Sequence, residues 1–124
     1  MVKTKSINDP VEASDGKRIL VMRRWARPYS KVRLQVAGKG QWLPELGPSK
    51  ALLDDWKNRE DTGFTWDEYV ARYTKEMESQ REAIAALAEE AQRGTITLLC
   101  QEKEGDPHCH RHLLKKMIEE AMEA

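Results

Sequence analysis

The chain has 124 residues, the usual size of one domain, so we expect a single domain over residues 1–124. Its 21 Lys and Arg residues balance its 21 Asp and Glu residues, and this neutral charge gives no ground for assigning a nucleic acid partner. No apolar run approaches the roughly 20 residues that span a bilayer, and no signal peptide is recognisable, so we expect a cytoplasmic protein without a membrane partner.

Strands are predicted where short runs match the strand period. Residues 17–22 and 95–100 are mostly apolar, rich in β-branched side chains and preceded by glycine, which is typical of buried strands. We expect both to be central strands of a mainly parallel sheet. Residues 2–7 alternate polar and apolar side chains, which indicates a third strand. Residues 32–36 alternate in the same way ahead of two glycines, which predicts an edge strand or a loop hairpin.

Polar capping residues mark where two helices begin. Ser49 can accept a hydrogen bond from an otherwise unpaired N–H group, which predicts a short helix over about residues 50–58. Thr65 and Glu68 have the spacing of a capping box, in which each side chain bonds the backbone of the other. A second helix is therefore predicted directly after Thr65.

This second helical pattern is too long for one straight helix. A continuous helix over residues 66–93 would be about 42 Å long, whereas a compact chain of this length has a radius of gyration near ~14 Å. We therefore predict a bend around residues 78–81, where the apolar stripe is interrupted. A last amphipathic helix is predicted from about His110.

The order of strands and helices is the βαβ pattern, which predicts an α/β fold. We expect a small, three-layer-like domain with a short, mainly parallel sheet flanked by helices. If the strands at 17–22 and 95–100 are parallel, the segments that follow them emerge at the same edge, where ligands of such sheets collect. The sequence thus predicts a site between residues 100–111 and the arginines around Trp25.

Basic and thiol side chains follow both of these strands. A proline-containing turn precedes the last helix, so Cys109 should lie near a helix N-terminus, where free N–H groups favour an anion or a thiolate. Arg111 should lower the pKa of this thiol further. We predict a site for a small, phosphate-like anion, with Cys109 as the candidate catalytic thiol. Its anion-binding residues are Arg23, Arg27, His110 and Arg111.

Ordered motifs spread over nearly the whole chain resemble those of a known family. They lie at residues 15–21, Arg23, Trp25, Arg27, 30–31, 42–46, 48–49, 72–73 and 109–111. On these motifs the chain resembles the YeaO-like proteins, a domain of unknown function (DUF488). Departures from the family pattern include Met22 and Pro28, where the family has an acidic residue and a glycine. The resemblance implies a compact α/β fold, supports the thiol and arginine positions above as family-pattern positions, and assigns no activity.

The same segment also carries residue types that serve metal and redox chemistry. Zinc-ligand types occur at Cys100, His108, Cys109, His110 and His112. Their spacing matches no common structural zinc pattern, and the neighbours Cys109 and His110 should point in different directions, so we predict no metal site. A redox pair of Cys100 and Cys109 would need Cα atoms within about 7 Å, and free thiols are expected otherwise. No dinucleotide or Walker pattern is present, so no cofactor is predicted.

Two classes of function remain open. One is a small enzyme or ligand-binding protein that acts on an anionic molecule, with a reactive thiol. The other is a non-catalytic module that docks a nucleic acid or an acidic protein; the nucleic acid is less favoured, because a basic run around a tryptophan is more often a solvated loop. Glu102 and Glu104 could supply a general base, although such loop residues are more often solvated charges. The sequence assigns no oligomeric state.

Overall fold

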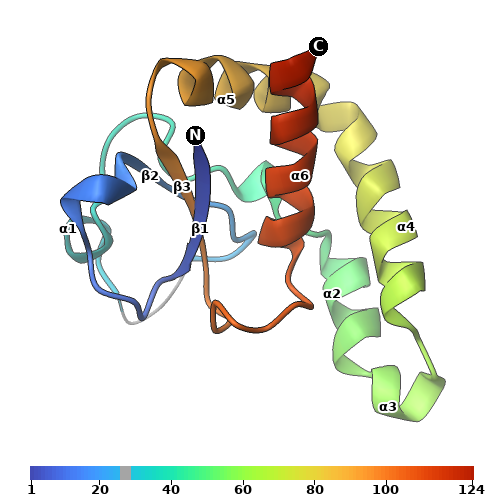
Figure 1. Cartoon of the computed structure of the whole chain (residues 1–124). Helices are drawn as coiled ribbons and strands as arrows, with labels where there is room; N and C mark the ends of the chain where they lie inside the picture. The colour runs from blue at the N-terminus through green and yellow to red at the C-terminus, as the bar shows by residue number, and fades with distance from the viewer. Residues whose placement is uncertain (26–28) are drawn as a thin grey trace.

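A computed structural model describes residues 1–25 and 29–124 of the chain. Three parallel strands form one sheet in the order β1-β3-β2, so that the strand latest in sequence lies in the centre (Figure 1). The strands are β1 (Val2–Ser6), β2 (Lys17–Leu20) and β3 (Ile96–Cys100). All five residues of β3 are buried, as expected for a central parallel strand. The three predicted strands and the parallel arrangement are confirmed, but the prediction that the strand at residues 17–22 is central is wrong, because β2 lies at an edge of the sheet.

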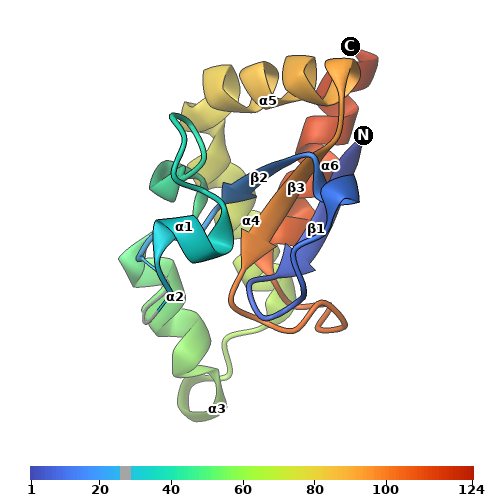
Figure 2. The ribbon, with the colours of Figure 1, turned by 90° about the vertical axis from the view of Figure 1, so that its left-hand side faces the viewer.

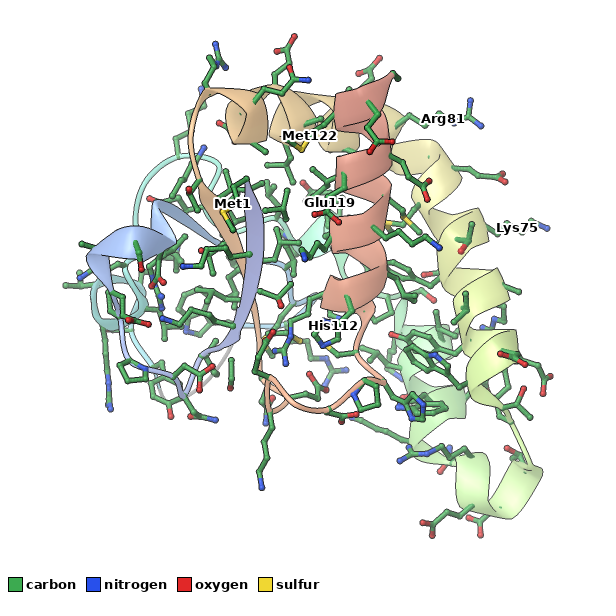
Figure 3. The ribbon with its side chains drawn as sticks, in the orientation of Figure 1. Met1, Lys75, Arg81, His112, Glu119 and Met122 are labelled. Atoms are coloured by element: carbon green, nitrogen blue, oxygen red, sulfur yellow. The ribbon has the colours of Figure 1, made fainter. Side chains whose placement is uncertain are left out.

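The helices lie on both sides of this sheet, and Figure 2 shows α1 on the opposite side of the strands from α6. They are α1 (Lys31–Leu34), α2 (Lys50–Lys57), α3 (Arg59–Thr62), α4 (Trp66–Met77), α5 (Arg81–Arg93) and α6 (His110–Glu123). The α/β fold class is therefore confirmed. Charged side chains such as Lys75 and Glu119 lie on the outer faces of α4 and α6 (Figure 3). Among the described residues, none of the helices is both long and apolar enough to cross a membrane.

Alternating strand residues build a core on each face of the sheet. The larger core joins the sheet to α4, α5 and α6, and includes Ile19, Leu98, Tyr73, Leu87, Leu114 and Ile118. The smaller core joins the sheet to α1 and the loop after it, and consists of Ile7, Leu20, Leu34, Val36 and Leu99. Helix α6 thus packs with its first turn close to the carboxyl end of β3.

The two central helix predictions are confirmed in detail. The Thr65 side chain accepts from the backbone N–H of Glu68, and the Glu68 carboxylate accepts from the backbone N–H of Thr65. Helix α4 then ends at Met77, a 3₁₀ turn covers Glu78–Gln80, and α5 continues in a new direction (Figure 1). The predicted bend lies at this turn.

The strand or hairpin predicted at residues 32–36 is wrong. Ser30 caps a short helix there, because its hydroxyl accepts from the backbone N–H of Arg33 at 3.0 Å. Helix α1 ends when Gln35 adopts a left-handed conformation with φ of 56°. One helical turn followed by this reversal buries Leu34 and Val36 in the same core. The burial of these two residues explains why the sequence alternates between apolar and polar side chains here.

A cluster of buried charges ties α1 to the sheet. Asp15 is fully buried, and its carboxylate accepts from Lys5 at 3.0 Å and from Arg18 at 2.6 Å. Arg18 also donates to the Leu34 carbonyl at 2.8 Å. Burial opposes ionisation of Asp15, but hydrogen bonds from the Glu12 backbone, Lys5 and Arg18 hold its pKa below the usual value.

The lowered pKa of Asp15 makes stability depend on pH. A carboxyl group whose pKa is lower in the folded than in the unfolded protein stabilises the fold above the unfolded pKa, and this contribution disappears as the pH falls. Below about pH 4, we expect the free energy of unfolding to fall more steeply in the wild type than in Asp15→Asn. Urea titrations followed by circular dichroism measure both slopes, with exposed Asp61→Asn as the matched control. Parallel slopes for wild type and Asp15→Asn would contradict the assignment.

Candidate functional site

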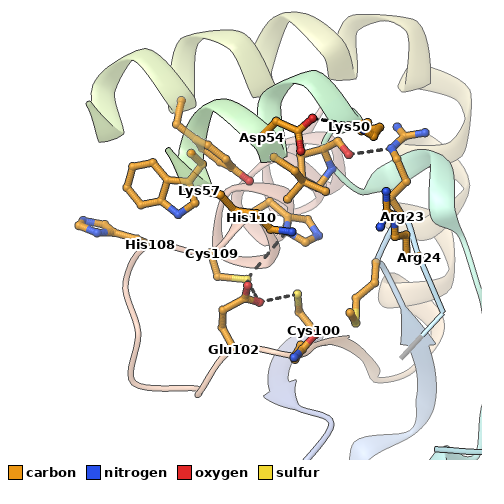
Figure 4. Close-up of a pocket in the computed structure, with 16 residues that line it drawn as sticks. Arg23, Arg24, Lys50, Asp54, Lys57, Cys100, Glu102, His108, Cys109 and His110 are labelled. Carbon is orange, nitrogen blue, oxygen red and sulfur yellow. Dashed lines mark hydrogen bonds and ion pairs between the residues drawn. The ribbon is translucent and has the colours of Figure 1, made fainter. Parts of the chain in front are cut away.

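A pocket lies beyond the carboxyl ends of β2 and β3 (Figure 4). Its walls come from the segment after β2, helix α2 with Pro48 before it, Tyr69 of α4 and the segment from Cys100 to His110. The parallel pairing brings these segments to one edge, as the βαβ pattern predicted. The pocket volume is about 180 Å³, below the roughly 300 Å³ at which sites for drug-sized ligands begin. It has room for a small group, with the rest of a larger ligand outside.

Cys109 and His110 form a thiol–imidazole pair in this pocket. Cys109 is the N-cap residue of α6, and its Sγ lies 3.9 Å from Nδ1 of His110. The other ring nitrogen, Nε2, lies 2.6 Å from the Val21 carbonyl oxygen. A carbonyl only accepts hydrogen bonds, so Nε2 carries a proton. Nδ1 is then left to accept from the Cys109 thiol, or to donate to its thiolate when the ring is charged. An oriented base next to a thiol is the arrangement of cysteine nucleophiles.

The carboxylate of Glu102 contacts both the thiol of Cys109 and a second thiol, that of Cys100. The Cys100 thiol donates to Oε2 of Glu102 at 2.9 Å, and Sγ of Cys109 lies 3.6 Å from the same oxygen. Both cysteines are buried and free, whereas the rest of Glu102 is exposed (Figure 4). Partial burial opposes ionisation of Glu102, but the hydrogen bond from Cys100 keeps its pKa below the usual value.

The two thiols differ in acidity. The neighbouring Cys100 side chain, the His110 imidazole and the backbone N–H of Arg111 favour the Cys109 thiolate against the cost of burial, and lower the pKa of Cys109 to about 5. The neighbouring Cys109, burial and the charge of Glu102 raise the pKa of Cys100 well above its usual value. Near neutral pH the site holds a thiolate at Cys109 and a thiol at Cys100.

Cations line the opposite wall of the pocket. They are Arg23, Arg24, Lys50 and Lys57, against the two carboxylates of Asp54 and Glu102. Arg23 donates to the carbonyls of Pro48 at 2.7 Å and Gly47 at 3.1 Å. The hydrogen bond from Lys50, helped by the charges of Lys57 and Arg24, lowers the pKa of Asp54. The surplus of positive charge favours an anion in the pocket.

An aromatic wall closes a third side. The ring of His108 stacks on Trp66 with centroids 4.7 Å apart and meets Trp56 edge-on at 5.8 Å. Tyr69 stacks against Trp66 from the helix side, and burial raises the pKa of Tyr69 far above its usual value, so it remains a neutral phenol. Trp56, Tyr69 and His108 of this wall line the pocket.

The structure brings some of the predicted site residues together. Cys109, His110 and Arg23 all line the pocket. Arg27 falls in residues 26–28, outside the described part of the chain. Trp25 anchors its segment by packing edge-on against Trp42 at 5.2 Å, and its ring N–H donates to the Tyr29 carbonyl.

Arg111 lies elsewhere than the sequence predicted. Its guanidinium is fully buried and donates to the carbonyls of Lys5 at 3.2 Å, Cys100 at 3.3 Å and Lys103 at 2.7 Å. Its Nε lies 3.4 Å from the Glu104 carboxylate. Arg111 therefore contacts β1, β3 and the site loop from behind the pocket. Its backbone N–H contributes to the lowered pKa of Cys109, whereas its side chain is not among those that line the pocket.

The positions of Cys100, Cys109 and His110 correct one of the arguments against a metal site. Sγ of Cys100, Sγ of Cys109 and a ring nitrogen of His110 lie within 4.8 Å of one another. The expectation that Cys109 and His110 point in different directions was wrong, because the imidazole turns back toward the preceding thiol (Figure 4). The spacing is close enough for one ion to contact all three. The absence of a metal stays a prediction.

Several residues of the site were not identified from the sequence. The sequence offers Glu102 as a candidate general base. It does not indicate that a carboxylate two residues beyond the strand lies between two thiols. Lys50, Lys57 and Tyr69 come from helices whose packing against the strand ends has no sequence signal. Arg24 is the residue that the sequence could most easily have added to the site, because it directly follows Arg23 in the basic run.

Comparison with known proteins gives consistent matches. A family model described as "Active DUF488-N3 subclade" (DUF488-N3a) matches residues 2–122. Uncharacterized protein YeaO of Escherichia coli K12 is 31% identical over 102 residues, covering 82% of this chain and 84% of the relative. Uncharacterized protein Rv3073c of Mycobacterium tuberculosis is 29% identical over 96 residues, covering 77% of this chain and 75% of the relative. No solved structure matches the chain significantly.

Proposed function

The chain belongs to the DUF488 family, and from this premise we propose that it is a thiol-dependent enzyme acting on a small anionic molecule. The matching subclade carries the description "active", which supports an enzyme over a docking module. The observation that carries the proposal is the Cys109–His110 pair in a pocket with a cationic wall. A concave site also favours a small ligand over a flat macromolecular surface.

The thiolate of Cys109 acts as the nucleophile. Its Sγ forms a bond to an electrophilic atom of the bound molecule, and the leaving group departs with the proton held on Nδ1 of His110. Water then cleaves the covalent intermediate, releasing the second product and returning a proton to the thiolate–imidazolium pair. The Val21 carbonyl keeps Nε2 protonated through both steps, so that Nδ1 is the atom that exchanges protons.

The cationic wall selects the substrate by charge. Arg24 and Lys57 line the pocket, and among the described residues neither has a hydrogen-bond or ion-pair partner that neutralises it. Arg23 is fixed by two carbonyls, which holds its charge at the pocket edge. A phosphate or carboxylate placed here lies opposite the thiolate. Both groups fit the pocket, and the structure of the wall supports an anion of this class.

A charge-matched pair of alkylating reagents tests this proposal. We expect wild-type protein to prefer the anionic reagent iodoacetate over neutral iodoacetamide, relative to the preference of free glutathione. Lys57→Ala or Arg24→Ala, which each remove one cation of the wall, should lower the rate of alkylation by iodoacetate roughly fivefold, the equivalent of about 1 kcal/mol. The rate of alkylation by iodoacetamide should stay nearly unchanged. Stopped reactions analysed by mass spectrometry give both rates.

Two controls make the result specific. Lys75→Ala removes a cation from the outer face of α4, away from the pocket, and should leave both rates as in the wild type (Figure 3). Inorganic phosphate should protect the wild-type thiol against both reagents. The anion site is refuted if Lys57→Ala and Lys75→Ala behave alike, or if wild type shows the same reagent preference as glutathione.

A further inference from the structure

Cys100 takes no part in the reaction proposed above, yet it is buried beside the reactive thiol. The two Sγ atoms lie within 4.8 Å of each other, and both face the pocket. We propose that Cys109 is a site of oxidation by hydroperoxides, and that Cys100 is the resolving thiol that converts the oxidised product to a Cys100–Cys109 disulfide. This inference rests on the thiolate assigned to Cys109 under the proposed function.

The first step is a two-electron oxidation of sulfur. The Cys109 thiolate attacks the outer oxygen of the hydroperoxide, an S–O bond forms and the O–O bond breaks. The departing alkoxide, or hydroxide from hydrogen peroxide, takes the proton from Nδ1 of His110 and leaves as an alcohol or water. The products are a sulfenic acid at Cys109 and a neutral imidazole. The pocket gives the oxidant its route to a sulfur that is otherwise buried.

The second step uses Cys100 and Glu102. The Glu102 carboxylate lies 2.9 Å from the Cys100 thiol and can accept its proton as Cys100 attacks the sulfenic sulfur. An S–S bond forms, the S–O bond breaks, and the hydroxide leaves as water with the proton that Glu102 received. The hydroperoxide has then been reduced by the two sulfurs, which lose two electrons in total.

The position of the two cysteines permits this closure. Cys100 ends β3 and Cys109 caps α6, and they flank the loop over residues 101–108. The sulfurs, which lie within 4.8 Å of each other, have to approach by rotation of the two side chains and adjustment of this loop. The disulfide removes the nucleophile of the proposed reaction, and reduction by a dithiol restores it. Oxidants would thus stop the enzyme reversibly, where a lone thiolate would be oxidised irreversibly.

Intact-protein mass spectrometry tests the proposal. Reduced wild type is treated with a small excess of hydrogen peroxide in the presence of a metal chelator, unfolded, and alkylated with N-ethylmaleimide. We expect a mass lower by two hydrogens, almost complete loss of both alkylatable thiols, and a peptide in which Cys100 is linked to Cys109. Dithiothreitol should restore both thiols.

Single substitutions identify the role of each sulfur. In Cys100→Ser, the sulfenic acid at Cys109 should persist, react with dimedone and proceed to the sulfinic acid on longer exposure. In Cys109→Ser, Cys100 should remain a free thiol, because its raised pKa leaves little thiolate. Equal dimedone labelling of wild type and Cys100→Ser, or linkage between chains in place of linkage within one chain, would overturn the proposal.

The outcomes separate this inference from the proposed function. If Cys109 shows the iodoacetate preference but no disulfide forms with peroxide, only the resolving role of Cys100 is wrong. If neither alkylation at low pH nor oxidation occurs at Cys109, the thiolate itself is wrong, and both proposals fall together.

Discussion

Replacing Cys109 with serine is expected to abolish alkylation by iodoacetamide at about pH 6, where wild type should still react readily. With its pKa at about 5, Cys109 is mostly thiolate at this pH, whereas an ordinary cysteine with a pKa of about 8.5 is almost entirely thiol. A thiolate of low pKa is intrinsically a weaker nucleophile, which offsets part of this gain. The net advantage of Cys109 over an ordinary cysteine at this pH is about tenfold.

The pH profile of the alkylation rate provides the measurement. In wild type the rate should rise with a midpoint near the pKa of Cys109 and then stay level. Cys100→Ala removes the side chain that contributes most to the low pKa of Cys109, so the midpoint should move upward while alkylation at high pH persists. A wild-type midpoint in the range of ordinary cysteines, or unchanged labelling of Cys109→Ser, would contradict the assignment.

Arg111→Ala is expected to lower the free energy of unfolding by about 3–5 kcal/mol, the usual effect of breaking a buried charged network. Three carbonyls, on β1, on β3 and in the site loop, each lose the donor that Arg111 supplies, although the Cys100 carbonyl keeps its bond from the Ile7 N–H. The buried carbonyls of Lys5 and Cys100 cannot reach water without opening the region between α6 and the sheet. The Glu104 carboxylate also loses its partner.

Urea unfolding monitored by circular dichroism measures this loss. Lys116→Ala, an exposed cation on the same helix, is the matched control and should stay within about 0.5 kcal/mol of wild type. Should Arg111→Ala fail to fold, Arg111→Lys keeps one donor and should be intermediate. If Arg111→Ala is as stable as Lys116→Ala, Arg111 does not stabilise the fold. The prediction from the sequence that Arg111 binds an anion would then be the better explanation of this residue.

Much of the fold could be predicted because its signals are local. The capping box at Thr65 and the interrupted stripe near Glu78 depend only on residues within a few positions of each other. The βαβ order then fixed the direction of the strands, since a long helical connection makes them parallel. The failure at residues 32–36 has the same origin: five alternating residues are too few to distinguish a strand from one capped helical turn.

The site was less predictable because it depends on side-chain directions. The sequence placed Cys109 at a helix start next to His110, but backbone periodicity does not say that the imidazole folds back onto the preceding sulfur. Nor does it say that the side chain of Arg111, one residue further on, contacts the strand carbonyls instead of the pocket. The contribution of Lys57 depends on how α2 packs at the strand ends, which no neighbouring residue encodes.

The strand order β1-β3-β2 has a consequence for how the protein folds. β1 and β2 are the first strands to be synthesised, yet they do not pair with each other, and the strand that each of them pairs with in the sheet is β3. Val2 pairs with Ile96 and Lys17 pairs with the same residue, so these contacts close long loops, the kind of contact that slows folding. During synthesis the two early strands therefore wait with open edges until residues 96–100 leave the ribosome, and in that interval they are exposed to aggregation. Cys100 ends the strand that completes the sheet, so the thiol site is assembled in the same late event as the core.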